Sequence, residues 1–278
     1  MAHQKSLVEI VEERIASGDM ELPVFDRTAL KMREMVDCGE FQPEAVEKLV
    51  GSDPVLSGAL LQCANSSFFG GIEKVVTVRD AIVRLGVKQV AELVILSKQK
   101  ELYEFKHGML HDVATSLWQH SVACGTGAQW LAKELQLGER TREAFLAGLL
   151  HDIGKLLLLR VIDDLIENKS FQPSEKLVLE LLDSLHCSQG VVLMEYWNFP
   201  EAYVRVARSH HDDEYDESDT LISLIRLVDM ACNKLGIGIR GEVETSLAAS
   251  AEAQRLRASE ITLARLELQL DDAMALAD

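Results

Sequence analysis

The chain has 278 residues, of which 47% are hydrophobic and 26% charged, and its formal net charge is −17 at pH 7. This is the composition of an ordinary globular protein, which argues against disorder, and the length allows one large domain or two smaller ones. The excess of 45 Asp and Glu over 28 Lys and Arg argues against nucleic acid and against an anionic membrane surface as partners, because both are bound by clustered basic side chains.

Targeting and redox features favour a cytoplasmic protein. No apolar run approaches the roughly 20 residues of a membrane span, and the amphipathic start of the chain differs from a signal peptide. The five cysteines are far apart, mostly lie among apolar or small residues, and form no CxxC motif: Cys38, Cys63, Cys124, Cys187 and Cys232. We therefore expect reduced core thiols.

Helical patterns dominate the sequence. Pro43, Pro54 and Pro200 each stand where an apolar helical pattern begins, and proline is favoured in the first turn of a helix. Six apolar residues between positions 146 and 157 fall on one broad helical face, whereas the sustained alternation of strands is absent. The sequence predicts an all-α fold, with residues 65–67 (Asn-Ser-Ser) at a helix end or cap.

The helical pattern is interrupted near residues 104–112. We predict an N-terminal helical lobe over residues 1–106, a histidine-rich lobe over 107–240, and one or two amphipathic helices over 241–278. The terminal helices either pack on the fold or mediate self-association, and packing is the simpler interpretation. The stretch 212–219 has six acids in eight residues, which is typical of a solvated loop.

Histidines and aspartates are the most informative residues. Five histidines in helical context follow from position 120 onward: His120, His151, His186, His210 and His211. Asp152 follows His151 directly, and Asp229 interrupts an apolar run, where burying a carboxylate is costly unless a metal ion or cation compensates. Imidazole and carboxylate groups suit Zn, Mn, Fe and Ni. Lys155 shares the helical face of His151 and Asp152, so its ammonium could hold a phosphate oxygen.

Each of these residues also has a simpler interpretation. A single histidine on a helix is usually a packed or surface residue. Asp229 could pair with Arg226 one turn back, and His210 and His211 could interact with the dipole at a helix C-terminus. The whole set, taken together, favours a metal site.

Several spaced motifs resemble the HDOD domain, the HD-related output domain of bacterial signalling, within the HD superfamily of metal-dependent phosphohydrolases. The motifs are Trp-Gln-His-Ser at 118–121, Phe-Leu-Ala-Gly-Leu-Leu-His-Asp-Ile-Gly-Lys at 145–155, the segment 180–200 with Trp-Asn-Phe-Pro at its end, and the histidine pair at 210–211. Residues 52–56, 64–68 and 81–86 resemble the N-terminal lobe of these domains. The resemblance covers residues 22–236 and implies a two-lobed all-α fold with an HD-type metal-site lobe second.

The ligand set is also similar to that of HD-GYP phosphodiesterases. This similarity implies one ion held by His120, His151, Asp152 and Asp229, and a second held by Asp152, His186, His210 and His211. Asp152 would bridge two divalent ions (Fe, Mn, Zn or Ni), and Lys155 would face the phosphate. The implied activity is that of a metal-dependent phosphohydrolase acting on a phosphorylated small molecule or nucleotide.

Two departures from that similarity matter. The stretch between His211 and Asp229 has no Gly-Tyr-Pro motif, and Ser116 stands where some of those enzymes have an acid for a third metal. These departures argue against cyclic-di-GMP hydrolysis and against a third ion. Six carboxylates near the mouth of a site would also repel a polyanion, unless that loop folds outward.

The alternative is a non-catalytic signalling or scaffold module. Many HDOD proteins have lost the metal ligands and are regarded as such modules, and residues 1–106 of this chain show no evident chemistry. The partners would then be signalling proteins, reached through protein–protein contacts. The oligomeric state stays open.

Overall fold

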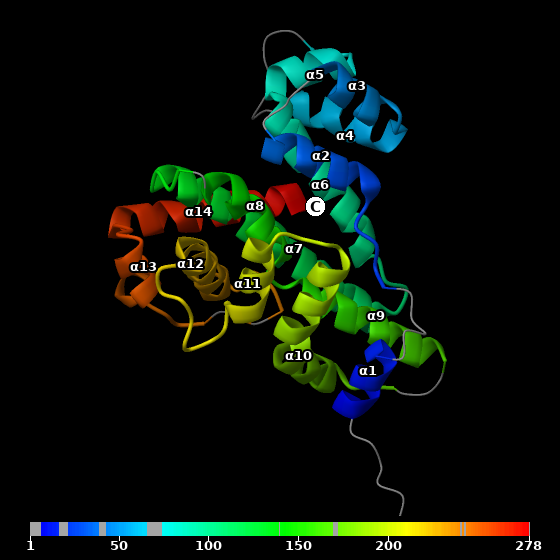
Figure 1. Ribbon diagram of the computed structural model, residues 1–278, viewed down its shortest axis with the longest axis vertical. Helices are drawn as coiled ribbons and strands as arrows, with labels where there is room; N and C mark the ends of the chain where they lie inside the picture. Colours follow the sequence, from blue (N-terminus) through cyan, green and yellow to red (C-terminus); the bar gives the residue numbers. More distant parts are fainter. Residues whose placement is uncertain are drawn as a thin grey trace, which may run out of the picture. The chain divides into compact units, whose positions relative to one another are not determined.

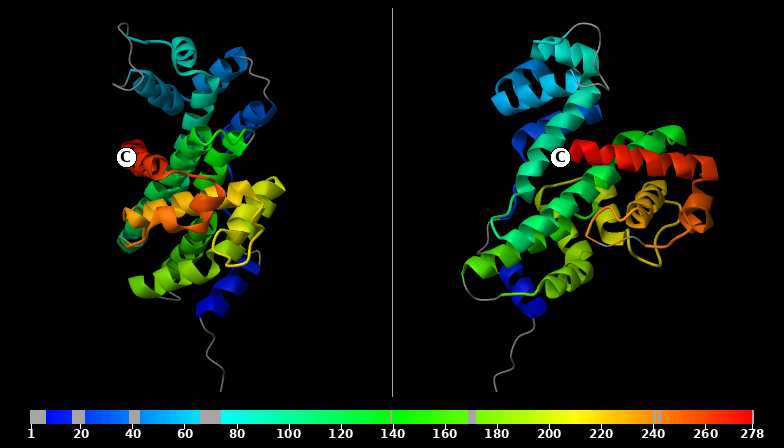
Figure 2. Two further views of the ribbon diagram at one scale, coloured as in Figure 1. Left: turned by 90° about the vertical axis from the view of Figure 1, so that its left-hand side faces the viewer. Right: turned by 180° about the vertical axis from the view of Figure 1, so that it is seen from behind.

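The structure is a computed structural model, and it describes residues 7–16, 22–38, 43–65, 74–138, 140–168, 172–239, 241 and 243–277. Every regular element in these ranges is a helix, so the predicted all-α class is confirmed (Figures 1 and 2). The chain splits into two compact units, of which one is Val24–Leu102 and the other combines Met1–Pro23 with Tyr103–Asp278.

This division differs in detail from the three segments expected from the sequence. The observed division after Leu102 lies close to the expected boundary after residue 106. The chain start nevertheless belongs to the histidine-bearing unit, because α1 (Leu7–Ala16) contacts α9, and Arg14 Nε lies 3.0 Å from Asp164 Oδ2. The C-terminal helices also belong to that unit, in which α14 contacts α7.

The smaller unit is built on an apolar core. Its helices are α2 (Arg27–Cys38), α3 (Pro43–Gly51), α4 (Pro54–Ala64), α5 (Val78–Leu85) and α6 (Val87–Lys100). Pro43 and Pro54 begin α3 and α4, as predicted. Asn65 caps the end of α4, and its side chain also bonds both the amide and the carbonyl of Val75, at 2.9 and 2.8 Å. The expected role of Ser66 and Ser67 lies outside the described residues.

The larger unit contains the long helices. They are α7 (Gly108–Glu134), α8 (Arg140–Leu150), α9 (Ile153–Glu167), α10 (Glu175–Tyr196), α11 (Glu201–Ser209), α12 (Thr220–Lys234), α13 (Ala251–Arg255) and α14 (Glu260–Ala277), with short 3₁₀ turns at Glu101–Tyr103 and Leu247–Ala249. Pro200 is the N-cap of α11, close to its predicted place. In this unit α7 contacts α8, α12 and α14, while α9 contacts α10.

One expectation about the helices is wrong. The broad apolar face over residues 146–157 is not one helix, because the chain leaves the helical path at His151 and Asp152, between α8 and α9. At this turn His151 Nδ1 lies 2.7 Å from the Gly148 carbonyl, a local bond that a continuous helix does not need. The break places the His-Asp pair at the junction of two helices.

Glycines allow the close helix crossings around this turn. A β-carbon on Gly148 would overlap the carbonyl of Cys124 in α7, and one on Gly154 would overlap the carbonyl of His186 in α10. Neither contact tolerates a larger side chain without movement of backbone. Glycine at 148 and 154 therefore brings the turn within reach of α7 and α10.

Among the described helices, α10 alone is long and apolar enough to cross a membrane by length and composition. It contacts α9 and α11, and 44% of its apolar window is buried inside the protein. Its contacts with α9 and α11 make it part of the larger unit.

Candidate metal centre

The structure brings together all eight residues singled out from the sequence. They come from six consecutive helices and their ends: His120 from α7, His151 and Asp152 from the turn after α8, Lys155 from α9, His186 from α10, His210 and His211 from the end of α11, and Asp229 from α12. Seven of them are at most 8% exposed, and His211 is exposed. Burial of so many polar groups in one place demands partners for them.

Each buried histidine is oriented by a main-chain carbonyl. His120 Nδ1 lies 3.0 Å from the Ile237 carbonyl oxygen. The corresponding distance is 2.7 Å from His151 Nδ1 to the Gly148 carbonyl and 2.8 Å from His186 Nδ1 to the Leu182 carbonyl. His210 Nδ1 makes the same kind of contact within its own helix, at 3.1 Å. Because a carbonyl only accepts, Nδ1 carries the proton, and the lone pair of Nε2 is left for the interior.

The inward nitrogens meet in pairs. The Nε2 atoms of His120 and His151 are 3.3 Å apart, and those of His186 and His210 are also 3.3 Å apart. In neutral rings with Nδ1 as the donor, two facing Nε2 atoms are both acceptors and cannot bond to each other, and in the pair that contains His120, whose pKa is raised, a proton takes the place that a cation would fill. A cation between them would satisfy both lone pairs.

Asp152 stands between the two pairs. Its Oδ2 lies 3.6 Å from Nε2 of both His120 and His151, and its Oδ1 lies 3.4 Å from Nε2 of both His186 and His210. Oδ1 is buried and has no hydrogen-bond partner. An orphaned carboxylate oxygen facing two imidazole nitrogens fits a divalent cation and is otherwise costly.

Two groups of donor atoms result, each with its atoms within 4.8 Å of one another. One group is His120, Cys124, His151 and Asp229, and the other is Asp152, His186, His210 and His211. Three members of the first group and all members of the second were predicted. Asp152 belongs to the second group, and its Oδ2 also faces His120 and His151 of the first.

Electrostatics keep most of these groups in the protonation state that a metal requires. Burial lowers the pKa of His151 to about 3 and that of His186 to about 4. His211 is exposed as a residue, but the face of its ring against His186 and His210 is desolvated, which lowers its pKa to about 3. Burial opposes ionisation of Asp152, but the nearby Lys155 and histidines outweigh it and hold its pKa well below the usual range. The three histidines are thus neutral and Asp152 is anionic near pH 7.

His120 and Asp229 form a coupled pair in the first group. His120 Nε2 is 3.2 Å from Asp229 Oδ1, and this contact holds the pKa of Asp229 below its usual range although burial opposes it. Burial also opposes protonation of His120, yet Cys124 and Asp229 outweigh it and raise the His120 pKa. The buried Asp229 carboxylate therefore favours a proton or a cation beside it.

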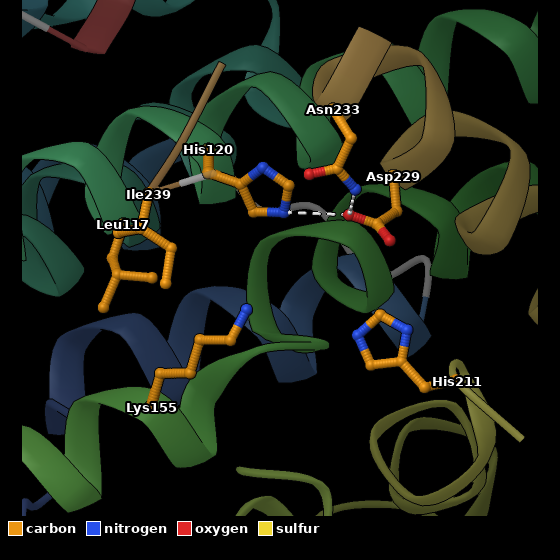
Figure 3. Close-up of a pocket in the computed structure, with 7 residues that line it drawn as sticks. All are labelled: Leu117, His120, Lys155, His211, Asp229, Asn233 and Ile239. Carbon is orange, nitrogen blue, oxygen red and sulfur yellow. Dashed lines mark hydrogen bonds and ion pairs between the residues drawn. The ribbon is translucent and has the colours of Figure 1, made fainter. Parts of the chain in front are cut away.

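A small cavity opens onto the two groups (Figure 3). It is lined by Leu117, His120, Lys155, His211, Asp229, Asn233 and Ile239. Lys155 pairs with Asp152 Oδ2 and reaches into the cavity from α9, while Asn233 donates from Nδ2 to Asp229 Oδ1 at 3.1 Å. The Lys155 ammonium therefore lies beside carboxylates at this cavity.

The acidic stretch 212–219 does not line this cavity. Arg226 holds it back by donating to the carbonyls of His210 and Asp212, at 3.0 and 2.8 Å, and by pairing with Glu252 at 2.7 Å. The suggested ion pair between Arg226 and Asp229 is therefore not formed. At the end of the stretch, Asp219 turns inward to cap α12.

Sequence reasoning missed three contributors to the site. Cys124 follows His120 by one helical turn, and Asn233 follows Asp229 by one turn, so helical spacing could have found both. The Ile237 carbonyl that orients His120 belongs to the loop after α12, and a main-chain group leaves no trace in sequence.

Solved structures share this fold. A HDOD domain protein from Geobacter sulfurreducens is 20% identical and has a TM-score of 0.76 over 97% of this chain and 96% of its own. A protein from Shewanella amazonensis SB2B has a name that proposes a metal-dependent phosphohydrolase. It is 18% identical and has a TM-score of 0.72, over 98% of this chain and 97% of its own. A protein from Marinobacter aquaeolei VT8 has a name that proposes signal transduction. It is 22% identical and has a TM-score of 0.67, over 100% of this chain and 62% of its own.

Sequence comparison agrees with the fold. An uncharacterized protein of Treponema pallidum (strain Nichols) is 24% identical over 228 residues, which is 78% of this chain and 43% of that relative, so the chain spans less than half of its length. The family model of the HDOD domain matches residues 22–213, more than half of the chain. Five of the site's histidines fall within this match and Asp229 lies beyond it. The chain therefore belongs to the HDOD domain family.

Proposed function

We propose that this protein is a metal-dependent phosphohydrolase with two divalent transition-metal ions, acting on a phosphorylated small molecule or nucleotide. The observation that carries the proposal is Asp152, a buried carboxylate whose two oxygens face two separate pairs of imidazole nitrogens. A purely structural aspartate would bond to donors on both oxygens, whereas Oδ1 has none. The Shewanella amazonensis protein of the same fold, whose name proposes a metal-dependent phosphohydrolase, points in the same direction.

Two ligand groups would hold the ions. His120, His151 and Asp229 supply one, His186, His210 and His211 supply the other, and Asp152 contacts both. When bound, divalent ions supply charge that activates water and stabilises negative charge on phosphoryl oxygens. The Nδ1 contacts with carbonyls fix the orientation of the rings and aim their Nε2 atoms inward, so the protein has little reorganisation to do.

Lys155 is the residue we assign to the phosphate. Lys155 is 5% exposed as a residue, it lines the cavity, and its ammonium pairs with Asp152 Oδ2. A buried ammonium beside an incoming phosphoryl group stabilises charge that develops on its oxygens, a role that typically contributes about 100-fold to turnover. Lys155 and Asp152 are thus the proposed catalytic residues.

Elemental analysis tests the metal part of the proposal. Protein purified without chelator should contain transition metal approaching two equivalents, and Asp152→Asn should lose most of it. Asp163→Asn is the matched control. Asp163 lies on α9 outside the site, and its Oδ1 is 2.6 Å from His107 Nδ1. Equal metal content in wild type and Asp152→Asn would contradict the assignment, as would protein that takes up no metal when it is offered.

Turnover tests the catalytic part. The metal-loaded protein should hydrolyse bis(p-nitrophenyl) phosphate or a member of a panel of nucleotides and cyclic dinucleotides. Lys155→Gln should keep its metal and lose about 100-fold in turnover. Metal content near two equivalents without turnover on the panel would overturn the hydrolase and favour the alternative.

That alternative is a signalling module that acts through protein contacts. The favouring observation is the unit Val24–Leu102, which has its own apolar core and contains no histidine. Such a unit has no share in the ligand set, so a partner-binding role would explain it. A name proposing signal transduction, carried by the Marinobacter aquaeolei protein of the same fold, points in the same direction.

A further inference from the structure

We propose that Cys124 is a ligand in this site, so that the ion held with His120, His151 and Asp229 is a thiophilic cation such as Zn²⁺. The inference rests on the proposed metal site and adds a sulfur donor that the family resemblance does not supply. Soft thiolate ligands select such cations over Mg²⁺ or Mn²⁺, which prefer oxygen. The identity of this donor therefore decides which metal the site takes.

The position of Cys124 follows from the helix. It lies four residues after His120 in α7, so that both side chains point from the same face of the helix. Cys124 is fully buried, and its Sγ lies within 4.8 Å of the donor atoms of His120, His151 and Asp229. Four donors of three chemical kinds thus surround one point.

The distances from His120 to the other three donors match the edges of a tetrahedral site. With Zn–N bonds of about 2.05 Å and a Zn–S bond of about 2.3 Å, a tetrahedron has edges of about 3.3 Å between nitrogens and about 3.6 Å from nitrogen to sulfur. From His120 Nε2, the measured distances are 3.3 Å to His151 Nε2, 3.2 Å to Asp229 Oδ1 and 3.5 Å to Cys124 Sγ. All three edges that start at His120 therefore have the length that a zinc-centred tetrahedron requires.

Two other thiols lie near the site, and their geometry differs. Cys232 Sγ is 3.6 Å from Cys124 Sγ, where it can donate a weak hydrogen bond to the ligating sulfur once the Cys124 proton has left to solvent. Cys187 Sγ is 3.4 Å from His186 Nε2 but does not join the four donor atoms of the second group. Each of these cysteines provides a matched control, because each is a thiol beside the site that the proposal excludes as a ligand.

Cobalt provides a readout independent of activity. Metal-free protein loaded with Co²⁺ should show the near-ultraviolet sulfur-to-cobalt charge-transfer band of a thiolate ligand. The band should be lost in Cys124→Ser and retained in Cys187→Ser and Cys232→Ser, with cobalt content measured in every sample. A band that survives in Cys124→Ser, or disappears only in one of the controls, would overturn the proposal.

The outcomes separate this inference from the proposed function. If the wild type takes up no cobalt, the metal site itself fails. If it takes up cobalt without a thiolate band, only the assignment of Cys124 fails. Cys124→Ala, which leaves no hydroxyl in the core, replaces the serine variant if that one does not fold. In either variant the Zn²⁺ affinity should fall about 10- to 100-fold, and the Mn²⁺ affinity should change little.

Discussion

Gly154 packs directly against the backbone carbonyl of His186, so closely that a β-carbon at residue 154 would overlap the carbonyl oxygen and come within 2.5 Å of the Gly190 amide nitrogen. This contact joins the first turn of α9 to the middle of α10. It sets the distance between Asp152, two residues before Gly154, and the His186 imidazole, whose Nε2 lies 3.4 Å from Asp152 Oδ1. The second donor group therefore depends on a helix crossing that only glycine permits.

Gly154→Ala should destabilise the protein and reduce its metal content. The added methyl group forces α9 and α10 apart, and overpacking of this kind costs about 1–3 kcal/mol, with larger values where backbone must move. Urea denaturation and elemental analysis measure the two effects. Gly58→Ala in α4 is the control, since nothing lies within 4 Å of its β-carbon, and it should be neutral or stabilise by up to about 1 kcal/mol. Equal stability of Gly154→Ala and wild type would contradict the packing argument.

Acid should destabilise the metal-free protein. Burial lowers the pKa of His151 to about 3 and that of His186 to about 4, while an unfolded histidine titrates near about 6.5. Between these values the unfolded state binds more protons, so the free energy of unfolding falls as the pH falls through this window. The raised pKa of His120 adds no dependence there, because His120 is protonated in both states below about pH 6.5.

Denaturation of chelator-treated protein at about pH 7 and about pH 5 measures this dependence, and the expected loss is on the order of 2 kcal/mol for each of the two histidines. His151→Gln should remove part of it. His111→Gln is the control, because His111 is exposed on α7. If His151→Gln kept the full pH dependence, protonation of His151 would not be its source.

Much of the fold and site could be predicted from the sequence, because helices start at prolines and because the histidines and aspartates of the site stand in motifs that resemble those of a known family. Pro43 and Pro54 begin helices as predicted, and the eight site residues lie together. Apolar periodicity alone could not reveal the break at His151, because the leucines on either side of it are all buried in the same core. Apolar patterning records burial and not the continuity of a helix.

The supporting contacts of the site were beyond sequence reasoning for a different reason. Arg226 stands one turn before Asp229, so local spacing favoured that pair. The guanidinium instead turns to Glu252, a residue 26 positions further on, and to two main-chain carbonyls. Contacts between distant segments and contacts to main-chain groups depend on the tertiary fold, which pairwise spacing does not encode.

Arg226→Met should weaken the second donor group more than the first. Arg226 donates to the carbonyl of His210, so its loss frees the chain at His210 and His211, and loss of such a supporting contact typically costs about 10- to 100-fold in metal affinity. Calorimetric titration with Zn²⁺ should show one weakened and one unchanged binding event. Arg208→Met, which removes an exposed pair with Glu201, should leave both events intact. Equal weakening of both events would indicate general unfolding.

Asp53 combines a helix cap with an ion pair, and two substitutions separate these roles. Its Oδ1 accepts from the amides of Val55 and Leu56 at 2.9 and 3.2 Å, and its Oδ2 lies 2.9 Å from Lys98 Nζ. Asp53→Ala removes both interactions and should cost about 1–2 kcal/mol, whereas Asp53→Asn keeps the cap and should cost about 0–1 kcal/mol. Urea denaturation compares the variants, and metal content should stay unchanged because every proposed ligand lies in the other unit.

The same comparison has a pH signature. The hydrogen bond from Lys98 holds the pKa of Asp53 below its usual value, so the ion pair stabilises the fold above the unfolded carboxyl pKa, and this contribution is lost as the pH falls through the folded pKa. The difference in the free energy of unfolding between wild type and Asp53→Asn should therefore shrink in acid. Asp53→Ala should stay less stable than Asp53→Asn at every pH, because an amide oxygen caps the helix at any pH. If Asp53→Asn lost as much as Asp53→Ala near pH 7, the contact with Lys98 and not the cap would stabilise the start of α4.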